Sequence, residues 1–595
     1  MPGEVTVSTL LSRFSVAVLA LGAVAFAARA PRPAPFEIVE ATIPAMQHAM
    51  QTHQVTSHDL VVQYLTRIAL YDKRINAAIT INPRAIEEAD ALDAERAAGH
   101  VRGPLHGIPI ALKDNIQTAG LRTTGGALAF TDFVPPYDAT LVKHLRDAGA
   151  VIIAKTVLTE LANWVSGTPT PMPGNYSAVG GFAFNPYDPR ADPRPTSDGS
   201  PVLSTGGSSS GAGTAASFWA ANVGTDTAGS VVNPAALTML VGLRPTTGRI
   251  SRYGIIPITA DQDTAGPMAR TVTDAAILFG VLEGGSPDPN DAATSRCAAP
   301  PGADYTKFLH ADGLRGKRIG IPRAYYYDRL TSPADANPPT ATPAPAAPGR
   351  GGRAGGRGGL NDAATALMAD AIAALTRLGA TVVDPANLPT VLDPDPAANI
   401  LNFPICSGTN NARGSDANCS VVLKYGMKRD FNAYLATLGA AAPVKSLGEL
   451  RAFNTAHARA GAIRYGQANL DISDEMDVVQ DRARYEADRA RDIRLAGDRG
   501  FKAAIDSNRL DALMFPGWAI SNLASRPGYP EIVVPVGMTP AGPGSATNPY
   551  PAGFNPKPSP YSAAFVGLPC SEPTLFEIAF AFEQATKRRV PPDLR

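Results

Sequence analysis

The sequence lacks the patterns that hold metals. Its four cysteines and eight histidines in 595 residues form neither a Cys-x-x-Cys motif nor a His/Cys cluster, which are the usual signatures of a zinc site. It also lacks an excess of basic residues, because Lys plus Arg and Asp plus Glu both number 53. We therefore expect no metal and no nucleic-acid partner, since the neutral balance gives no overall basic footprint.

Long apolar runs are also scarce, and the one that stands out lies at the N-terminus. Arg13 precedes an apolar run over residues 14–27, and Ala25-Phe26-Ala27 fits a small-x-small cleavage site. The run is too short for a comfortable membrane span. We expect residues 1–27 to be a signal peptide and the mature protein to be periplasmic or secreted. An uncleaved N-terminal anchor or a buried helix is the alternative.

Cysteine use bears on the same question. In an exported protein some cysteines are expected to pair. Cys406 and Cys419 flank a loop rich in Gly, Asn, Ser and Asp, so they are the best candidates for a bridge. Four unpaired thiols are the alternative that the sequence leaves open.

Helical and strand-like patterns alternate along the chain, which favours an α/β protein. Apolar residues make up 45% of the sequence, enough for a large core. We expect one α/β domain over residues 36–595. Residues 332–359 are rich in Ala and Pro and then in Gly and Arg, so we expect a disordered insertion there. The patterns predict helices at 43–71 (in two parts), 84–99, 139–148, 360–378 and 575–586, and strands at 109–112, 151–154, 380–383, 510–515 and 531–536.

Two glycine-rich segments that carry serines, and one lysine, are the chemically most informative features. The segments are residues 206–211 and 224–230, and Lys113 follows the apolar run at 108–112. Small residues let the backbone approach a substrate and point several N–H groups at one spot. A serine hydroxyl there becomes a nucleophile if a base is near, and a desolvated lysine can be that base.

These segments resemble the amidase signature family, and the sequence of residues 224–270 most resembles the bacterial peptide-amidase branch of that family. The resemblance runs from about residue 40 to 590 and includes several motifs in the family's order. It implies a single large domain with a mixed, twisted central β-sheet covered by helices on both faces. The matching segments are Gly-Pro-Leu-His-Gly-Ile-Pro at 103–109 leading to Lys113-Asp114-Asn115, the glycine-rich runs at 206–211 and 224–235, and those at 241–246, 254–257 and 263–270.

The resemblance also implies roles for individual residues. Ser230 would be the nucleophile that forms an acyl-enzyme, Ser208 would lie on a cis peptide bond and relay protons, and Lys113 would be the base. Ser–Lys systems are known variants of the catalytic triad. The protein would thus be an exported amidase acting on a linear small-molecule or peptide amide, with water as second substrate and no cofactor. The backbone N–H groups of Thr227, Ala228, Gly229 and Ser230 would form an oxyanion hole.

The sequence departs from the family pattern in three places. The interval between Ser208 and Ser230 is about two residues shorter, and we expect the deletion to fall in a helical region at 215–223. Residues 187–203 and the segment after Val536 carry extra length. Substrate choice therefore cannot be transferred from the family.

Other interpretations remain open. Residues 207–211 formally match a G-x-S-x-G nucleophile elbow centred on Ser209, although the preceding strand pattern is weak. An amidotransferase subunit that releases ammonia in a tRNA-dependent complex shares the Ser-Ser-Lys motifs, and a catalytically silent binding protein would share the fold. We interpret His106, Asp226 and Arg244 as structural.

Overall fold

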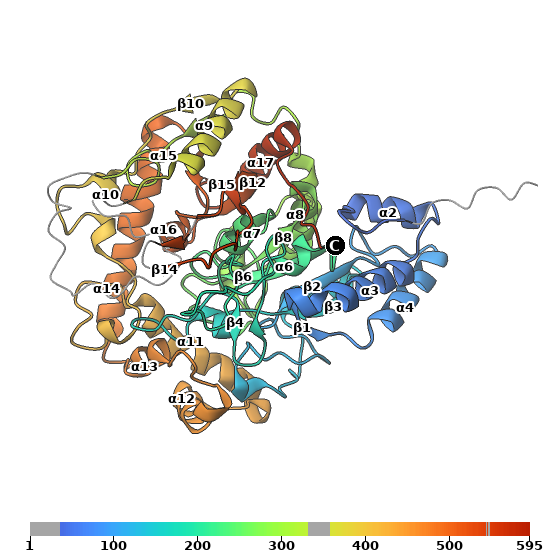
Figure 1. Ribbon diagram of the computed structural model, residues 1–595, viewed down its shortest axis with the longest axis horizontal. Coiled ribbons are helices and arrows are strands. Elements are labelled where there is room, and N and C mark those ends of the chain that lie inside the picture. Colours follow the sequence, from blue (N-terminus) through green and yellow to red (C-terminus); the bar gives the residue numbers. More distant parts are fainter. Residues whose placement is uncertain (1–35, 331–357, 543, 546–547, 595) are drawn as a thin grey trace, which may run out of the picture.

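The computed structural model describes residues 36–330, 358–542, 544–545 and 548–594 (Figure 1). The predicted signal peptide at 1–27 lies outside the described residues. So does the predicted insertion at 332–359, apart from Gly358 and Gly359.

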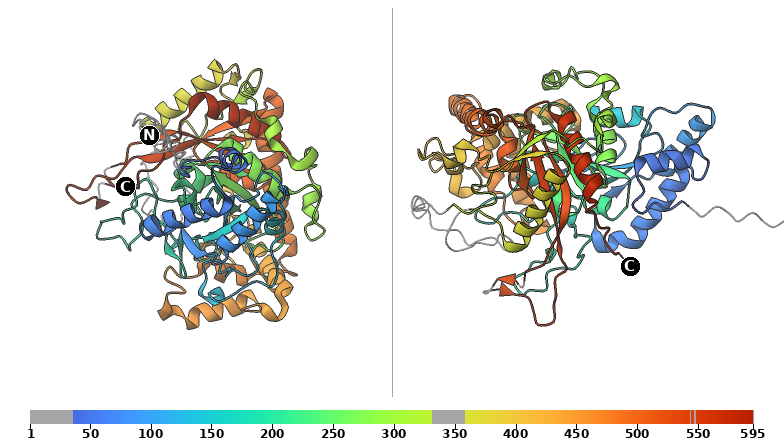
Figure 2. Two further views of the ribbon diagram at one scale, coloured as in Figure 1. Left: turned by 90° about the vertical axis from the view of Figure 1, so that its right-hand side faces the viewer. Right: turned by 90° about the horizontal axis from the view of Figure 1, so that it is seen from above.

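A mixed sheet of 11 strands forms the centre of the molecule, with helices on both of its faces (Figures 1 and 2). Its strand order is β1-β3-β2-β6-β8-β7-β12-β15-β11-β9-β10. Neighbours β3, β2 and β6 are parallel, as are β11, β9 and β10, whereas the central strands pair antiparallel. The fold prediction is therefore confirmed. The strands are β1 (Ala78–Ile81), β2 (Pro109–Lys113), β3 (Val151–Thr156), β6 (Ala221–Asp226), β7 (Val241–Arg244), β8 (Thr264–Ala269), β9 (Arg318–Gly320), β10 (Thr381–Val383), β11 (Ala512–Pro516), β12 (Glu531–Thr539) and β15 (Ser559–Val566).

The helices divide between the sheet and a separate helical region. Those that pack near the sheet are α2 (Ile43–Gln51), α3 (Ser57–Ile75), α4 (Ala85–Ala97), α5 (Thr140–Asp147), α6 (Ala212–Ala215), α7 (Val232–Leu237), α8 (Val272–Glu283), α9 (Asp362–Arg377), α15 (Ala503–Asn508), α16 (Ser521–Ser525) and α17 (Glu572–Thr586). The short helix α10 (Pro389–Leu392) contributes Val391 to the same hydrophobic core as the sheet. The separate helical region consists of α11 (Val422–Leu438), α12 (Leu447–Ala456), α13 (Ala468–Asp474) and α14 (Arg482–Asp492). A π-helical turn at Ile493–Lys502 joins α14 to α15.

Local sequence explains where these elements begin. The Thr56 side chain accepts a hydrogen bond from the Asp59 amide, and Asp59 accepts one from Thr56 in return. This capping box fixes the start of α3. The predicted strand at 109–112 is β2, which extends one residue further to Lys113. One predicted helix is wrong: residues 215–223 contain only the end of α6, a left-handed Ser217 and the start of β6.

Two hydrophobic cores stabilise the fold. The larger one lies between the sheet and its helices, and the smaller one joins α11, α12 and α13 to residues around Phe130 and Trp164. The second core matters for the site because it sets α11 beside the end of β6. No helix within the described part of the chain has the length and apolar character needed to cross a membrane.

Both disulfides join segments of this fold. Cys406 pairs with Cys419, which confirms the bridge proposed from the sequence. Cys297 pairs with Cys570, which the sequence did not indicate because 273 positions separate the two cysteines.

The two segments of extra length pack against each other although they are far apart in the sequence. The guanidinium of Arg190 lies 4.2 Å from the ring centre of Phe554, and that of Arg194 lies 4.5 Å from the ring centre of Tyr550. The Lys557 amide donates to Asp188 at 2.9 Å. Together they form a projection that stands out from the body of the molecule (Figure 2).

Candidate active site

Lys113 is the centre of a fully buried polar group at the end of β2. Its Nζ lies 2.7 Å from Ser208 Oγ, 2.8 Å from Thr225 Oγ1 and 3.2 Å from the Thr225 carbonyl oxygen. Asn115 Nδ2 donates to the same Thr225 hydroxyl at 3.1 Å. Because β2 and β6 are parallel neighbours, their carboxyl ends bring Lys113 and Thr225 to one edge of the sheet.

Burial makes this lysine a base at neutral pH. Loss of solvation disfavours the ammonium form and lowers the pKa of Lys113 to about 7, although the carboxylates of Asp226 and Asp263 oppose the shift. Neither carboxylate forms an ion pair with Lys113, since Asp226 binds Arg244 and Asp263 binds backbone amides. The amine can therefore take a proton from a hydroxyl beside it.

Ser208 lies in the turn that the first glycine-rich segment makes. Gly206 has a φ of +99°, which a glycine adopts without strain. The peptide bonds on either side of Ser208 are trans, because the cis bonds of the described residues are Thr168-Pro169 and Asp384-Pro385. The cis bond implied by the family resemblance is therefore not present. The glycine already turns the chain, and a cis bond before a residue other than proline costs about 3–4 kcal/mol.

Ser230 lies at the end of residues 227–230, a segment that we call the nucleophile loop because the family resemblance implies that Ser230 is the nucleophile. Its carbonyl oxygen accepts a hydrogen bond from the Ser209 amide at 3.1 Å, and its side of the loop is partly exposed. Among the described residues, the hydroxyls of Ser208 and Ser230 do not hydrogen-bond to each other. The structure thus brings Lys113 and Ser208 into contact and places the backbone of Ser230 against Gly207 and Ser209, the two neighbours of Ser208.

Asp226 binds the backbone of the nucleophile loop. Its carboxylate accepts hydrogen bonds from the amides of Gly229 at 2.8 Å and Val231 at 2.7 Å, and it forms a buried ion pair with Arg244 at 2.8 Å. The structural interpretation of Asp226 and Arg244 is therefore confirmed. The Gly229 amide therefore already donates its hydrogen bond to Asp226. Within the described residues, the amides of Thr227, Ala228 and Ser230 have no such acceptor.

The remaining sequence candidates take structural positions. His106 is buried away from this group, where its Nε2 lies 3.0 Å from the Leu92 carbonyl oxygen. The Ser209 hydroxyl bonds to the backbone of Thr225 rather than to a base. Sequence reasoning missed Thr225 and Asn115, although both lie next to residues that it singled out.

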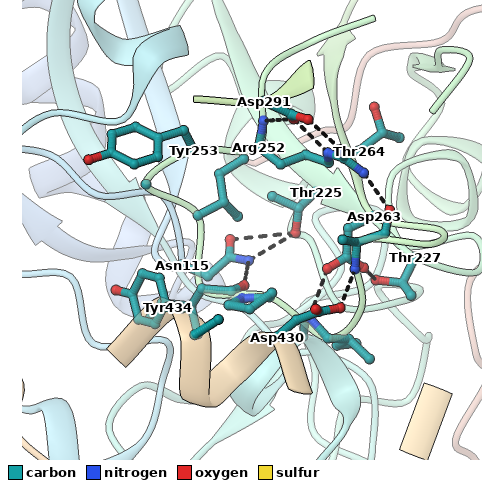
Figure 3. Close-up of a pocket in the computed structure, with 18 of the residues that line it drawn as sticks. Asn115, Thr225, Thr227, Arg252, Tyr253, Asp263, Thr264, Asp291, Asp430 and Tyr434 are labelled. Atoms are coloured by element: carbon teal, nitrogen blue, oxygen red, sulfur yellow. Dashed lines mark hydrogen bonds and ion pairs between the residues drawn. The ribbon is translucent and has the colours of Figure 1, made fainter. Parts of the chain in front are cut away.

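A cavity of about 210 Å³ adjoins the lysine end of the group (Figure 3). Asn115, Thr225, Thr227 and Tyr434 of α11 are among the residues that line it. Ser208 and Ser230 do not line it. Residues Ile255–Ile258, Ala162 and Ala433 contribute apolar surface to the wall, and Arg252, Asp263, Asn290, Asp291 and Asp430 contribute polar groups.

The backbone beside this cavity is strained. Leu161, Ala162 and Asn163 have φ values of +43°, +57° and +72°, a left-handed conformation that residues with a Cβ seldom adopt. Such strain persists where the surrounding structure enforces it, commonly at functional sites. The cavity therefore lies between a strained segment and Thr225, the hydrogen-bond partner of Lys113.

The acidic groups around the cavity are satisfied internally. Asp263 accepts hydrogen bonds from Thr227 Oγ1 at 2.6 Å and from the amides of Ile258 and Thr259. Asp291 binds Arg252, as Figure 3 shows. Among the described residues there is no group of three or more His, Cys, Asp or Glu side chains that could hold a metal ion.

A buried lysine bonded to a serine, beside a second serine in a glycine-rich loop, defines the class of Ser–Lys hydrolases. The comparisons with known proteins agree. The family model described as Amidase matches residues 59–341. A probable amidase of Arabidopsis thaliana is 32% identical over 562 residues, 94% of this chain and 92% of the relative. The chain belongs to the amidase family, and it is an amidohydrolase.

Solved structures give the same result. The native peptide amidase of Stenotrophomonas maltophilia is 35% identical, with a TM-score of 0.73 over 95% of this chain and all of that chain. The predicted likeness to the peptide-amidase branch is thus confirmed. A glutamyl-tRNA(Gln) amidotransferase subunit of Geobacter sulfurreducens is 39% identical over 297 residues, which are 49% of this chain and 56% of that relative.

Proposed function

We propose that the protein is an exported amidase that hydrolyses a linear carboxamide through an acyl-enzyme on Ser230. The observation that carries this proposal is the 2.7 Å contact between Lys113 Nζ and Ser208 Oγ in a fully buried setting. A neutral amine has two protons and one lone pair. Two of its three neighbours are oxygens of Thr225, which can accept those protons, and the lone pair then faces the Ser208 hydroxyl.

The proposed reaction follows from this arrangement. Lys113 takes the proton of Ser208 as Ser208 takes that of Ser230, and Ser230 Oγ attacks the carbonyl carbon of the amide. The amides of Thr227, Ala228 and Ser230 face the charge that develops on the carbonyl oxygen, whereas Gly229 would first have to leave Asp226. The C–N bond then breaks, and the nitrogen leaves with the proton returned through Ser208. Water attacks the acyl-enzyme by the same relay and releases the acid.

The cavity beside Thr225 suits the apolar part of the substrate. Its wall offers isoleucine and tyrosine side chains, and its acidic groups are already paired. A small-molecule amide or the end of a peptide amide with an uncharged side chain fits this chemistry.

Export is supported by the disulfides. All four cysteines of the sequence pair, and disulfides persist in oxidising compartments such as the periplasm. Cell fractionation and the N-terminal mass of the purified protein test this part. Cleavage after Ala27 is expected, and an intact N-terminus in a cytoplasmic fraction would contradict it.

Amine release from a panel of peptide amides, aliphatic amides and aryl anilides tests the activity. The mature protein, Ser230→Ala and Lys113→Ala are assayed side by side, with circular dichroism to establish folding. We expect both variants to fold and to lose turnover by at least about a thousandfold. Wild-type turnover in either variant would overturn the assignment. A folded wild type that releases ammonia only with added partner subunits would instead favour the amidotransferase alternative.

A further inference from the structure

A buried carboxyl group lies behind the nucleophile loop, outside the Lys113–Ser208 pair. Glu531 is the first residue of β12 and has no exposed surface. It stands opposite Arg244 in the antiparallel register of β12 and β7, so both side chains lie on the same face of the sheet. Its Oε1 is 2.9 Å from Ser521 Oγ, and its Oε2 has no hydrogen-bond partner.

The count of hydrogens around Ser521 indicates the protonation state of Glu531. Ser521 Oγ also lies 2.9 Å from the Trp518 carbonyl oxygen, which can only accept. The single Ser521 proton cannot serve both contacts. If Glu531 carries a proton, it donates to Ser521 while Ser521 donates to Trp518, and both contacts are made. Burial first, and then the nearby Asp226 carboxylate, raise the pKa of Glu531 to about 8, in agreement with this count.

Ser521 connects this carboxyl group to the nucleophile loop. A Cβ atom placed on Gly229 would lie 2.9 Å from Ser521 Cβ, and Gly229 has a φ of +109°. Ser521 therefore packs directly on the Gly229 backbone, whose amide is held by Asp226. A shift of Ser521 would therefore displace Gly229, the residue directly before Ser230.

The charges that face Glu531 are those of Asp226 and Arg244. In the neighbouring strand β15, the residue paired with Glu531 is the apolar Val566. From α16, the uncharged Ser521 contacts Glu531. Arg244 Nε is buried without a partner. An ionised Glu531 would attract Arg244 and repel Asp226, and so weaken the ion pair that orients the loop amides.

We propose that Glu531 is a positioning residue that works in its protonated form, holding Ser521 against Gly229 and leaving Arg244 bound to Asp226, so that Ser230 stays in place. The inference rests on the proposed function, because it takes Ser230 as the nucleophile. It makes the loop sensitive to alkaline pH through a group that does not touch the substrate.

The dependence of kcat on pH for wild type and Glu531→Gln tests the proposal. In the wild type kcat should rise through about pH 7 and fall above about pH 8, by about tenfold per pH unit at the limit. Glutamine keeps a neutral donor to Ser521. Glu531→Gln should therefore keep kcat at pH 7 within about threefold and lose the falling limb. Glu531→Ala, which removes the donor, should lower kcat at every pH.

Two further variants control the interpretation. Glu160 is another buried carboxyl group whose pKa is raised to about 8, so Glu160→Gln should retain the falling limb. Glu583 on α17 accepts from the Val272 amide, and Glu583→Gln should leave the whole profile unchanged. A difference infrared spectrum between wild type and Glu531→Gln at pH 7 should show the band of a protonated carboxylic acid.

The outcomes separate the two proposals. A falling limb that persists in Glu531→Gln, a wild-type profile that stays flat above pH 8, or an infrared spectrum without the acid band would each overturn the role of Glu531. Wild-type turnover by Ser230→Ala would instead overturn the proposed function.

Discussion

Lys113 and Thr225 meet through two contacts, from Lys113 Nζ to the hydroxyl of Thr225 at 2.8 Å and to its carbonyl oxygen at 3.2 Å. Thr225 thereby occupies two of the positions around the amine and leaves the third for Ser208. The same threonine lines the adjoining cavity. One residue of β6 thus orients the proposed base and borders the proposed substrate site.

The first prediction concerns the acidic side of the pH profile. Because burial lowers the pKa of Lys113 to about 7, the unprotonated base is scarce below that pH and prevails above it. We expect kcat/KM to rise with pH through about 7, which initial rates between pH 5.5 and 8 will measure. Lys113→Arg should abolish turnover at every pH, since a guanidinium does not give up its proton in this range. A rate that is constant down to pH 5.5 would contradict the assignment.

The second prediction separates the serines of the first glycine-rich segment. Ser209 Oγ donates to the Thr225 carbonyl at 3.0 Å and accepts from the Thr225 amide at 3.2 Å. Ser209→Ala should lower the free energy of unfolding by about 1–3 kcal/mol, because it removes buried hydrogen bonds. Its turnover should persist, whereas Ser208→Ala should lose it. Urea denaturation and amine release measure the two effects, and loss of turnover in a stable Ser209→Ala would revive the nucleophile-elbow interpretation.

Much of the fold could be predicted from the sequence because local signals were strong. The apolar runs at 109–112 and 151–154 correspond to strands β2 and β3 of the structure. The helix prediction for residues 215–223 failed because small residues carry little periodic signal. Residues 221–223 instead belong to a strand that pairs with β8.

The site was predictable only in part. Motif order pointed to Lys113, Ser208 and Ser230, and the structure brings the first two into contact. Thr225 and Glu531 could not be found in this way. Their importance depends on which side chain lies opposite, and such contacts arise from strand pairing between distant segments.

The third prediction concerns the cavity. Ala433 of α11 lines the cavity and is exposed. Ala433→Phe should fill part of the 210 Å³ and raise KM for bulky amides by about tenfold, since the ring competes with the substrate for space. Acetamide-sized substrates should be unaffected. Ala436→Phe, on the same helix and exposed but absent from the cavity wall, is the matched control. Equal effects of the two variants, or none for Ala433→Phe, would argue against substrate binding there.

The fourth prediction compares the two disulfides. Cys297 and Cys570 lie 273 positions apart in the sequence, whereas Cys406 and Cys419 lie 13 positions apart. If a bridge stabilises mainly by restricting the unfolded chain, its effect grows with loop length. Replacing the short bridge by two serines should cost about 3 kcal/mol of unfolding free energy, and replacing the long bridge about 6 kcal/mol. Equilibrium urea denaturation of both double variants measures the difference.

The informative result is which of the two double variants loses more unfolding free energy. Cys570 lies two residues before Glu572, the first residue of α17, which binds the buried Arg249, so the long bridge also ties the start of that helix to the loop that carries Cys297. A larger loss for Cys297→Ser/Cys570→Ser would agree with the loop-length argument. A larger loss for Cys406→Ser/Cys419→Ser would show that native packing dominates, because Cys406 and Cys419 belong to the small buried cluster with Tyr425 and Met476 at the start of α11. In that case turnover on bulky amides should fall as well, since α11 carries one wall of the cavity.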